Sequence, residues 1–344
     1  MDLINDYVDA PTLTGFTRRA ASDLDVNQFT LSRWLPVVTI DDIEFRAPVG
    51  GAGLATVAQF RSYDSESPIS DRRGIERIMG ELPPISEKKF LSEYASLRLR
   101  RSQANDPVVA AIYSDAFELT RAILARFERA RGEALITGQL AINENRVQQT
   151  VNFGRDAAAS VAPSTLWSVS TADILGDLMT WLDAYVALNG EEPGAILTSR
   201  RVLGLMMRNE AFRQLVSTTA GTPSIVSQAG LNSTLNAYGL PSIETYDAQV
   251  SVAGAATKVL PDDRLLMLPA PTGGVPTDNA LGATYVGTTL EAQEPEFNLA
   301  AGGQAGIVAG TWKSKDPVQL WTKAGAIGLP ILGNANRAFV ADVA

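Results

Sequence analysis

The chain has 344 residues and a net charge of −9, and 19% of its residues are charged, against about 25% in an average soluble domain. It contains neither cysteine nor histidine, which excludes disulfides, thiolate nucleophiles, Cys/His zinc sites and histidine-containing catalytic triads. The acidic balance disfavours a conventional nucleic-acid binder. Since interface cores are depleted in charge, the low charge content favours a surface covered by other subunits.

No segment reaches the roughly 18 to 20 consecutive apolar residues that a membrane helix needs, so we expect no membrane span. The acidic N-terminus does not resemble a basic signal peptide, and we expect an unprocessed, soluble chain. The last stretch, residues 321–344, is apolar, but Gly325, Gly328, Pro330 and Gly333 interrupt it. We expect its strands to pair beside the longest helix of the chain.

The N-terminal third carries an arm and a hairpin. Residues 1–36 show no sustained period, and we expect an extended arm with one short helix. Residues 37–49 and 56–64 have the composition and alternation of strands, and the glycine-rich stretch 50–55 lies between them. This pattern predicts a β-hairpin. The polar, proline-broken segment 65–89 is then expected to return the chain to the main body.

The strongest helix signal covers residues 107–137. Asp106 and Pro107 provide a typical helix start, and Gly138 provides a typical end. Apolar residues recur between them at steps of three or four, at Val108, Ile112, Ala116, Leu119, Ile123, Phe127, Ala130 and Ala134. Basic residues cluster at 98–101 and 126–133, where acids are interleaved with them or follow them, and we interpret both stretches as solvated helix faces.

The residues that follow Gly138 predict a mixture of helices and strands. We expect a strand pair at 140–154, a strand, a turn and a strand at 257–271, and strands on both sides of the turn at Asp316-Pro317 within 306–332. We also expect helices at 168–190 and 200–216 with the strand 193–199 between them, a loop with a short helix at 221–247, and a strand at 283–294.

Two motifs with catalytic or cofactor associations are incomplete. Gly51-Ala52-Gly53 follows a predicted strand but lacks the third glycine and the helix of a dinucleotide fingerprint, so we interpret it as the hairpin turn. Ser86 and Lys89 have Ser-x-x-Lys spacing without the other motifs of the hydrolases that use it. We therefore expect no nucleophile there.

Four carboxylates, Asp262, Asp263, Glu294 and Glu296, could form an acid/base pair without histidine or cysteine. The sequence does not bring them together in space, and acids are common in turns such as these. We expect no catalytic, cofactor-binding or metal-binding residues, and keep a carboxylate hydrolase as a distant alternative.

The order of these parts resembles the tailed-phage major capsid proteins of the Hong Kong 97 type, and the local sequence is similar to the major capsid protein E family, the lambda-like branch. The resemblance lies in the succession of "ALITGQLAI" (134–142), "GLPSIETYDAQV" (239–250), "LPDDRLLMLP" (260–269), "LGATYVGTTLEA" (281–292) and "SKDPVQLWTKAGAIGLPIL" (314–332). Residues 1–35 match least.

The resemblance implies an α+β capsid fold with five parts. These are an N-terminal arm (1–36), an extended loop (37–90), a peripheral domain (91–159) with a spine helix (107–137), an α/β axial domain (160–305) and return strands of the peripheral domain (306–344).

The resemblance also implies a structural role without enzyme activity or cofactors. Hexamers and pentamers of the chain would form an icosahedral head in the virion, assembled in the host cytoplasm. The head would enclose double-stranded DNA contacted without sequence specificity. Scaffold, portal and decoration proteins are the implied partners. A cellular encapsulin, which shares the fold and packages an enzyme, is the alternative.

Overall fold

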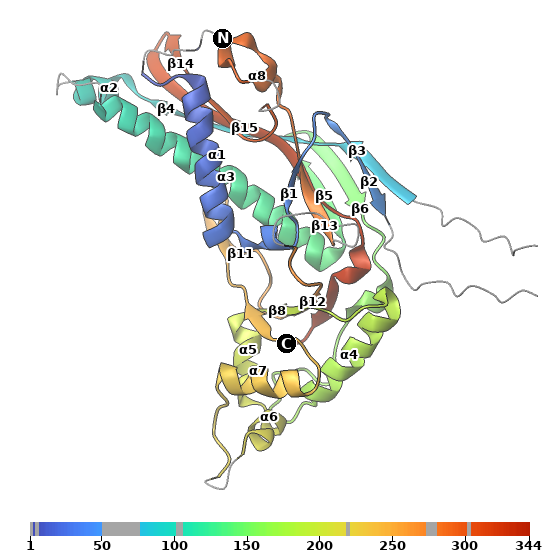
Figure 1. Cartoon of the computed structure of the whole chain (residues 1–344). Coiled ribbons are helices and arrows are strands. Elements are labelled where there is room, and N and C mark those ends of the chain that lie inside the picture. The colour runs from blue at the N-terminus through green and yellow to red at the C-terminus, as the bar shows by residue number, and fades with distance from the viewer. Residues whose placement is uncertain are drawn as a thin grey trace, which may run out of the picture.

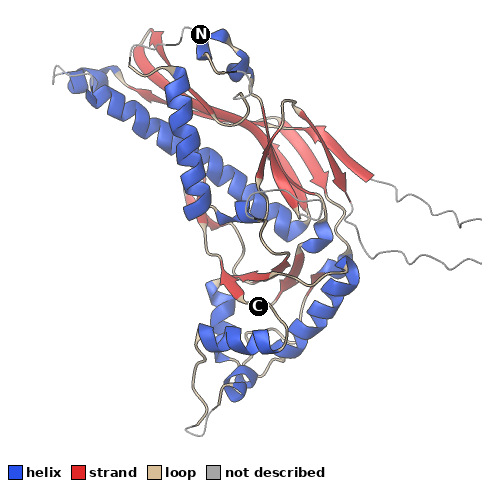
Figure 2. Ribbon diagram, viewed as in Figure 1, coloured by secondary structure: helices blue, strands red, loops and turns tan. Residues whose placement is uncertain are grey.

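The computed structural model describes residue 3 and residues 7–49, 76–100, 106–217, 221–272, 281–300 and 304–344. Figure 1 shows an elongated molecule with an upper and a lower lobe. The upper lobe contains a five-stranded sheet and the crossing helices α1 and α3, and the lower lobe contains a second five-stranded sheet with helices α4 to α7. Figure 2 shows helices and strands in both lobes, so the α+β class is confirmed.

The predicted long helix is present as α3 (Asp106–Thr137). Its 32 residues span about 48 Å at 1.5 Å per residue. Gly138 follows with φ 67°, a left-handed conformation that glycine adopts without strain. Every predicted member of the apolar stripe is buried, namely Val108, Ile112, Ala116, Leu119, Ile123, Phe127, Ala130 and Ala134.

The N-terminal segment differs from the expected extended arm with one short helix. Helix α1 (Ala10–Asn27) has 18 residues, and the Asp9 side chain caps its start. It crosses α3 and also packs against the upper sheet (Figure 1), with Leu13 and Leu24 buried. A 3-10 turn, η1 (Thr30–Arg33), follows. This part of the expectation is therefore wrong, because tertiary packing stabilises a helix that the sequence pattern marks only weakly.

The upper sheet is organised around one 15-residue strand, β15 (Val318–Leu332). β15 pairs antiparallel with β14, β4 and β13, and β1 pairs parallel with β13. The partners are β1 (Val37–Thr39), β4 (Pro84–Leu91), β13 (Gly282–Gly287) and β14 (Val308–Lys315). The predicted strands on the two sides of Asp316-Pro317 are thus confirmed, and β15 packs against α3 while β14 packs against α1.

Two antiparallel ribbons flank this lobe. β5 (Gln139–Glu144) and β6 (Val147–Asn152) form the predicted pair after α3. β2 (Glu44–Val49) pairs with β3 (Glu76–Glu81), which lies in the segment expected only to return the chain. The predicted turn 50–55 and second strand 56–64 fall outside the described residues.

The lower sheet has the order β7-β16-β12-β8-β9. Its two outer pairs are parallel and its two inner pairs are antiparallel. The strands are β7 (Ser160–Val161), β8 (Ala195–Thr198), β9 (Ile243–Thr245), β12 (Arg264–Leu268) and β16 (Phe339–Asp342). β16 pairs with β12 and β7, so the prediction that the final strands all lie beside the long helix is wrong for β16.

The lower helices also correct one prediction. A single helix was expected over 200–216, but α5 (Arg200–Arg208) and α6 (Glu210–Leu215) are separated at Asn209. The predicted helix ending at Gly190 is present as α4 (Ile174–Asn189), and α7 (Gln228–Ala237) is the short helix expected within 221–247.

The strand, turn and strand predicted over 257–271 are confirmed as β11 and β12, of which β11 pairs with β10 and β12 joins the lower sheet. The other elements of the fold are β10 (Gln249–Val252), β11 (Ala255–Lys258), α2 (Glu93–Arg100), α8 (Leu290–Gln293), η2 (Ala157–Ala159), η3 (Pro295–Phe297) and η4 (Ala335–Arg337).

The lower sheet is shared by the two hydrophobic cores. On β12, Leu265 and Met267 belong to the lower core, while Leu266 and Leu268 belong to the upper core. This alternation follows from the two-residue period of a strand that is buried on both faces. The two lobes are therefore joined by a continuous apolar layer.

Candidate functional site

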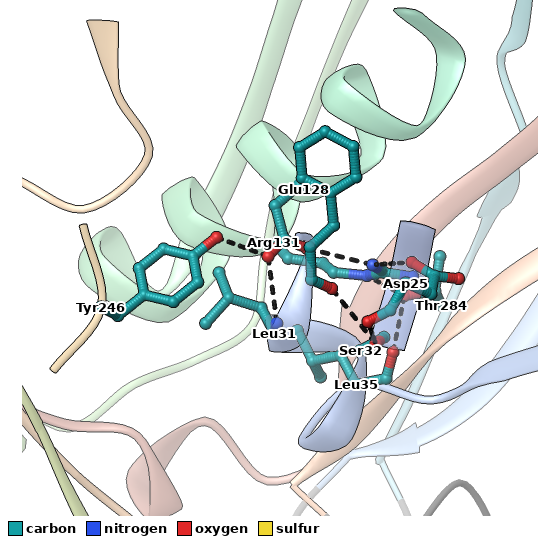
Figure 3. Close-up of polar contacts among 9 residues, drawn as sticks. Asp25, Leu31, Ser32, Leu35, Glu128, Arg131, Tyr246 and Thr284 are labelled. Atoms are coloured by element: carbon teal, nitrogen blue, oxygen red, sulfur yellow. Dashed lines mark hydrogen bonds and ion pairs between the residues drawn. The ribbon is translucent and has the colours of Figure 1, made fainter. Parts of the chain in front are cut away.

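A buried group of charged and polar side chains lies where α3 meets residues 25–35 and the segment that follows β9. Glu128 and Arg131 lie one turn apart on α3, and both side chains are 0% exposed. Arg131 Nη1 donates to Glu128 Oε2 over 3.1 Å. Figure 3 shows that Leu31 and Tyr246 approach Glu128 from two other segments. The Leu31 N–H donates to Glu128 Oε1 over 3.0 Å, and the Tyr246 hydroxyl donates to the same oxygen.

Arg131 continues these contacts towards α1 and β13. Its Nη1 donates to Asp25 Oδ1 over 3.2 Å, and its Nε donates to Thr284 Oγ1 over 3.0 Å. The Thr284 hydroxyl in turn donates to the Leu35 carbonyl over 2.9 Å. We call Asp25, Glu128, Arg131, Tyr246 and Thr284 the buried charged cluster. It ties together α1, α3, β13 and the segment that follows β9.

Burial dominates the electrostatics of this cluster. Loss of solvation raises the pKa of Asp25 and of Glu128, against the opposing effect of the Arg131 charge. Burial, and then the nearby Glu128 carboxylate, raise the pKa of the Tyr246 hydroxyl, which stays protonated and serves as a donor. With both carboxylates ionised, the cluster holds two negative charges and one positive charge.

A second polar group lies next to Tyr246. The Tyr246 N–H donates to the Thr198 carbonyl over 2.9 Å, which extends the β8–β9 pairing. Asp247 accepts a hydrogen bond from Lys258 Nζ over 3.0 Å, and Lys258 also forms an ion pair with Asp262. Hydrogen bonds to Asp262 and Asp247 raise the pKa of Lys258. Tyr246 therefore links the lower sheet to Glu128, and Asp247 links it to Lys258.

The four carboxylates considered for acid/base chemistry are not brought together. Asp262 and Asp263 precede β12 in the lower lobe, where Asp262 pairs with Lys258 and Asp263 pairs with Arg264 over 3.3 Å. Glu294 and Glu296 line a cavity of about 370 Å³ between α8 and β14 at the upper end of the molecule (Figure 1). Within the described ranges, no group of acidic side chains has the arrangement of a metal site.

The other motifs considered in the sequence also lack a site geometry. Ser86 and Lys89 lie three residues apart on β4, so their side chains point to opposite faces of the strand, and Lys89 pairs with Glu118 of α3. Gly51-Ala52-Gly53 falls outside the described residues. In the part of the chain that the structure describes, no helix is long and apolar enough to cross a membrane.

The structure corrects the interpretation of residues 126–133 as a solvated face, because Glu128 and Arg131 are among the most buried polar side chains of the molecule. The apolar stripe carries no signal of this burial. At 100° per residue, Arg131 lies about 40° around the helix from Phe127, at the edge of the stripe, and Glu128 lies about 100° from Phe127, outside it. Their burial comes instead from residues 25–35 and from Tyr246, which cover this side of α3.

Large apolar side chains are exposed at the end of the upper lobe that carries α2. We call Phe90, Tyr94, Leu97 and Val318 the tip surface. Tyr94 is 71% exposed and Leu97 is 61% exposed. The Phe90 ring packs 5.0 Å from Trp321, centroid to centroid, and Leu97 and Val318 line the same shallow pocket. Clustered apolar exposure of this kind is typical of a surface that contacts another protein.

Large apolar side chains are also exposed elsewhere. In the lower lobe they are Leu166, Val169, Leu215, Ile225 and Tyr238, and on the β2–β3 ribbon Met79 is exposed. Exposed apolar groups at several distant places fit a subunit with several neighbours rather than an enzyme with one cleft.

Comparison with protein families identifies the chain. The family model described as phage major capsid protein E matches residues 52–342. The chain belongs to this family. No curated protein sequence matches the capsid protein. Because its family is that of a structural shell component, the chain is a structural protein of the virion capsid and not an enzyme.

Solved structures support the same fold. A putative capsid protein of a prophage in E. coli CFT073 is 14% identical, with a TM-score of 0.65 over 98% of this chain and 99% of that one. A phage-related protein from Bordetella bronchiseptica RB50 is also 14% identical, with a TM-score of 0.62 over 98% of each chain. The capsid fold of the Hong Kong 97 type, expected from the sequence, is thereby confirmed.

The encapsulin alternative has a more distant counterpart. The encapsulin of Synechococcus elongatus PCC 7942 is 12% identical, with a TM-score of 0.45 over 91% of this chain and 86% of that one. A likeness at that level carries no argument for an encapsulin. The family match therefore decides for a phage capsid protein that assembles into multimeric shells.

Proposed function

We propose that this capsid protein assembles as hexamers and pentamers into the icosahedral head that encloses the double-stranded DNA of a tailed phage. The observation that carries the proposal is the match to the major capsid protein E family over residues 52–342. The apolar surfaces at the tip and in the lower lobe, together with the low charge content, support extensive contacts between copies.

Within the shell, we assign the proposed parts as follows. Residues 1–36 are the N-terminal arm, 37–90 the extended loop, 91–159 and 306–344 the peripheral domain, and 160–305 the axial domain. The exposed apolar residues of the lower lobe support a meeting point of copies at the centre of each hexamer or pentamer. The β2–β3 ribbon, which leaves the upper lobe in Figure 1, supports a loop that contacts an adjacent subunit.

The proposed partners follow from this role. A net charge of −9 favours a shell that surrounds DNA without binding it tightly, so contacts with the packaged genome are non-specific. Scaffold and portal proteins would direct assembly in the host cytoplasm, and decoration proteins would bind the finished head.

The test is negative-stain electron microscopy of the full chain expressed alone and with candidate scaffold proteins. Closed, uniform shells are expected, and they would elute in the void volume on size exclusion. A chain that remains monomeric under all of these conditions would contradict the proposal. Mass spectrometry of purified particles distinguishes the encapsulin alternative, since an encapsulin would retain an enzyme as a stoichiometric cargo.

A further inference from the structure

We propose that the buried charged cluster is a proton-sensitive latch that fastens residues 25–35 to the long helix α3. This inference concerns the single subunit and goes beyond its assembly into shells. Its basis is the convergence of Asp25, the Leu31 N–H and Tyr246 on one pair of α3 side chains, Glu128 and Arg131.

The latch is made of few bonds that come from distant parts of the chain. Glu128 Oε1 accepts from the Leu31 N–H, 97 residues away, and from the Tyr246 hydroxyl, 118 residues away. Asp25 reaches the same site through Arg131, at a sequence separation of 106 residues. Moving residues 25–35 away from α3 would break the bonds at Leu31 and at Asp25 together, so the two contacts form or break as one unit.

The composition of the cluster is not one that maximises stability. Replacing a buried ion pair by well-packed apolar residues is often neutral or stabilising, because desolvation offsets the attraction between the charges. Arg131 Nη2 is also buried without a hydrogen-bond partner among the described residues. Buried polar groups are nearly always satisfied, so this arrangement favours a role in specifying or switching a conformation.

Asp25 is the group that can exchange a proton with solvent. Its side chain is 18% exposed, whereas those of Glu128 and Arg131 are 0% exposed. Its Oδ1 accepts from Arg131. Arg131 is the charged group that acts on Asp25 directly. Behind Arg131 lie the Glu128 carboxylate of α3 and the Thr284 hydroxyl of β13, and Glu128 accepts from the Leu31 N–H and from the Tyr246 hydroxyl. Protonation of Asp25 leaves the Glu128 carboxylate as the single negative charge of the cluster, paired with the Arg131 guanidinium.

The direction of the pH effect follows from the folded-state pKa. Burial raises the pKa of Asp25 above that of a solvated aspartate, so the closed latch binds this proton more tightly than the opened one does. The contribution is fully present below the ordinary aspartate pKa and is lost as the pH rises through the raised pKa. Opening of residues 25–35 therefore becomes easier as the pH increases across that window.

Hydrogen exchange at the Leu31 amide tests the latch, because this N–H donates to Glu128 only when the latch is closed. Protection factors, corrected for intrinsic exchange, are measured on the full-length unassembled subunit from pH 4 to pH 8. In the wild type, protection at Leu31 should fall by about tenfold over this range for each unit of raised pKa. The Phe153 amide, bonded to the Gly138 carbonyl over 3.0 Å, is the internal reference.

Two conservative variants and a matched control complete the test. Asp25→Asn mimics the protonated side chain, so Leu31 protection should stay high and lose the part of its pH dependence that comes from Asp25. The part that comes from Glu128, whose pKa is also raised by burial, should remain. Tyr246→Phe removes one donor to Glu128 and should lower Leu31 protection at every pH. Tyr185→Phe removes another buried hydroxyl, 3.5 Å from the Arg337 carbonyl and outside the cluster, and should leave Leu31 unchanged.

The proposal is overturned if Asp25→Asn keeps the pH profile of the wild type, or if Tyr246→Phe protects Leu31 as well as Tyr185→Phe does. The outcome is independent of shell formation. A subunit that makes no shells would contradict the proposed function, while the exchange measurement would still decide on the latch.

Discussion

The last turn of α3 leaves backbone carbonyls without partners inside the helix, and a single side chain satisfies them. The Arg155 guanidinium donates to the Ile136 carbonyl over 2.7 Å, to the Ala134 carbonyl over 3.3 Å and to the Leu135 carbonyl. Burial lowers the pKa of Arg155 to about 10, so it remains charged at neutral pH and complements the negative end of the helix dipole.

Replacing Arg155 by methionine should therefore destabilise the subunit. Methionine keeps apolar bulk but provides no donor, so the Leu135 and Ile136 carbonyls lose the Arg155 donor, while the Ala134 carbonyl keeps the Gly138 N–H. The expected cost is about 1–3 kcal/mol in the free energy of unfolding. Urea denaturation of the unassembled subunit measures the change. Arg200→Met is the control, because Arg200 is 85% exposed and should cost less than about 0.5 kcal/mol. Equal effects of the two substitutions would contradict the capping role.

Only some of these residue-level features are predictable from the sequence. The end of the long helix was predictable from Gly138, which has the positive φ of a typical helix stop. The role of Arg155 was not, because the β5–β6 ribbon must first return the chain to the end of α3. Glu128 and Arg131 were predicted to be solvated because acids and basic residues are interleaved there, and only the covering segment of residues 25–35 makes them buried.

At the scale of elements, a strong apolar period predicts the helices well but does not predict a break within a helical segment. The break between α5 and α6 depends on Asn209, which is 1% exposed. Its Oδ1 accepts from the Ala211 and Phe212 amides, and its Nδ2 donates to the Ser170 and Ala172 carbonyls. The apolar period continues through this point, so the pattern alone indicated one helix. The break is set by long-range bonds to residues before α4.

Substitutions at Asn209 separate its two roles. Asn209→Ala removes the helix cap and both amide donors, and should lower the free energy of unfolding by about 3 kcal/mol. Asn209→Ser keeps an oxygen that caps α6 and should recover about 1 kcal/mol of that loss. Thermal and urea unfolding of the unassembled subunit measure both variants. If serine and alanine were equally destabilising, the cap would contribute nothing and only the bonds to residues 170 and 172 would matter.

At the scale of the whole molecule, the order of parts was predictable while long-range pairing was not. The succession of local stretches was enough to indicate the capsid fold. The place of β16 in the lower sheet, between β7 and β12, depends on partners far away in sequence. The apolar C-terminal stretch is explained by both cores, since β15 packs on α3 while Phe339 and Ala341 fill the lower core.

The tip surface gives the prediction that belongs to the assembled molecule. Tyr94 and Leu97 are exposed on α2 and do not belong to either hydrophobic core. Exchanging both for serine should leave the fold and the unfolding transition of the subunit nearly unchanged. Each large apolar side chain that becomes buried at an interface contributes about 1.5–3 kcal/mol, and a shell repeats this contact in every subunit. We therefore expect Tyr94→Ser with Leu97→Ser to abolish closed shells.

The matched control is Tyr94→Phe with Leu97→Met, which keeps the apolar area and should still assemble. Circular dichroism and urea unfolding report on the subunit, and negative-stain microscopy reports on the shells. Shells of the serine variant at the yield of the wild type would show that the tip surface faces solvent in the head. Loss of shells in both variants would point instead to the shape of the two side chains. Loss in the serine variant alone would assign the contact to apolar burial, because the control pair keeps the apolar area that the serine pair removes.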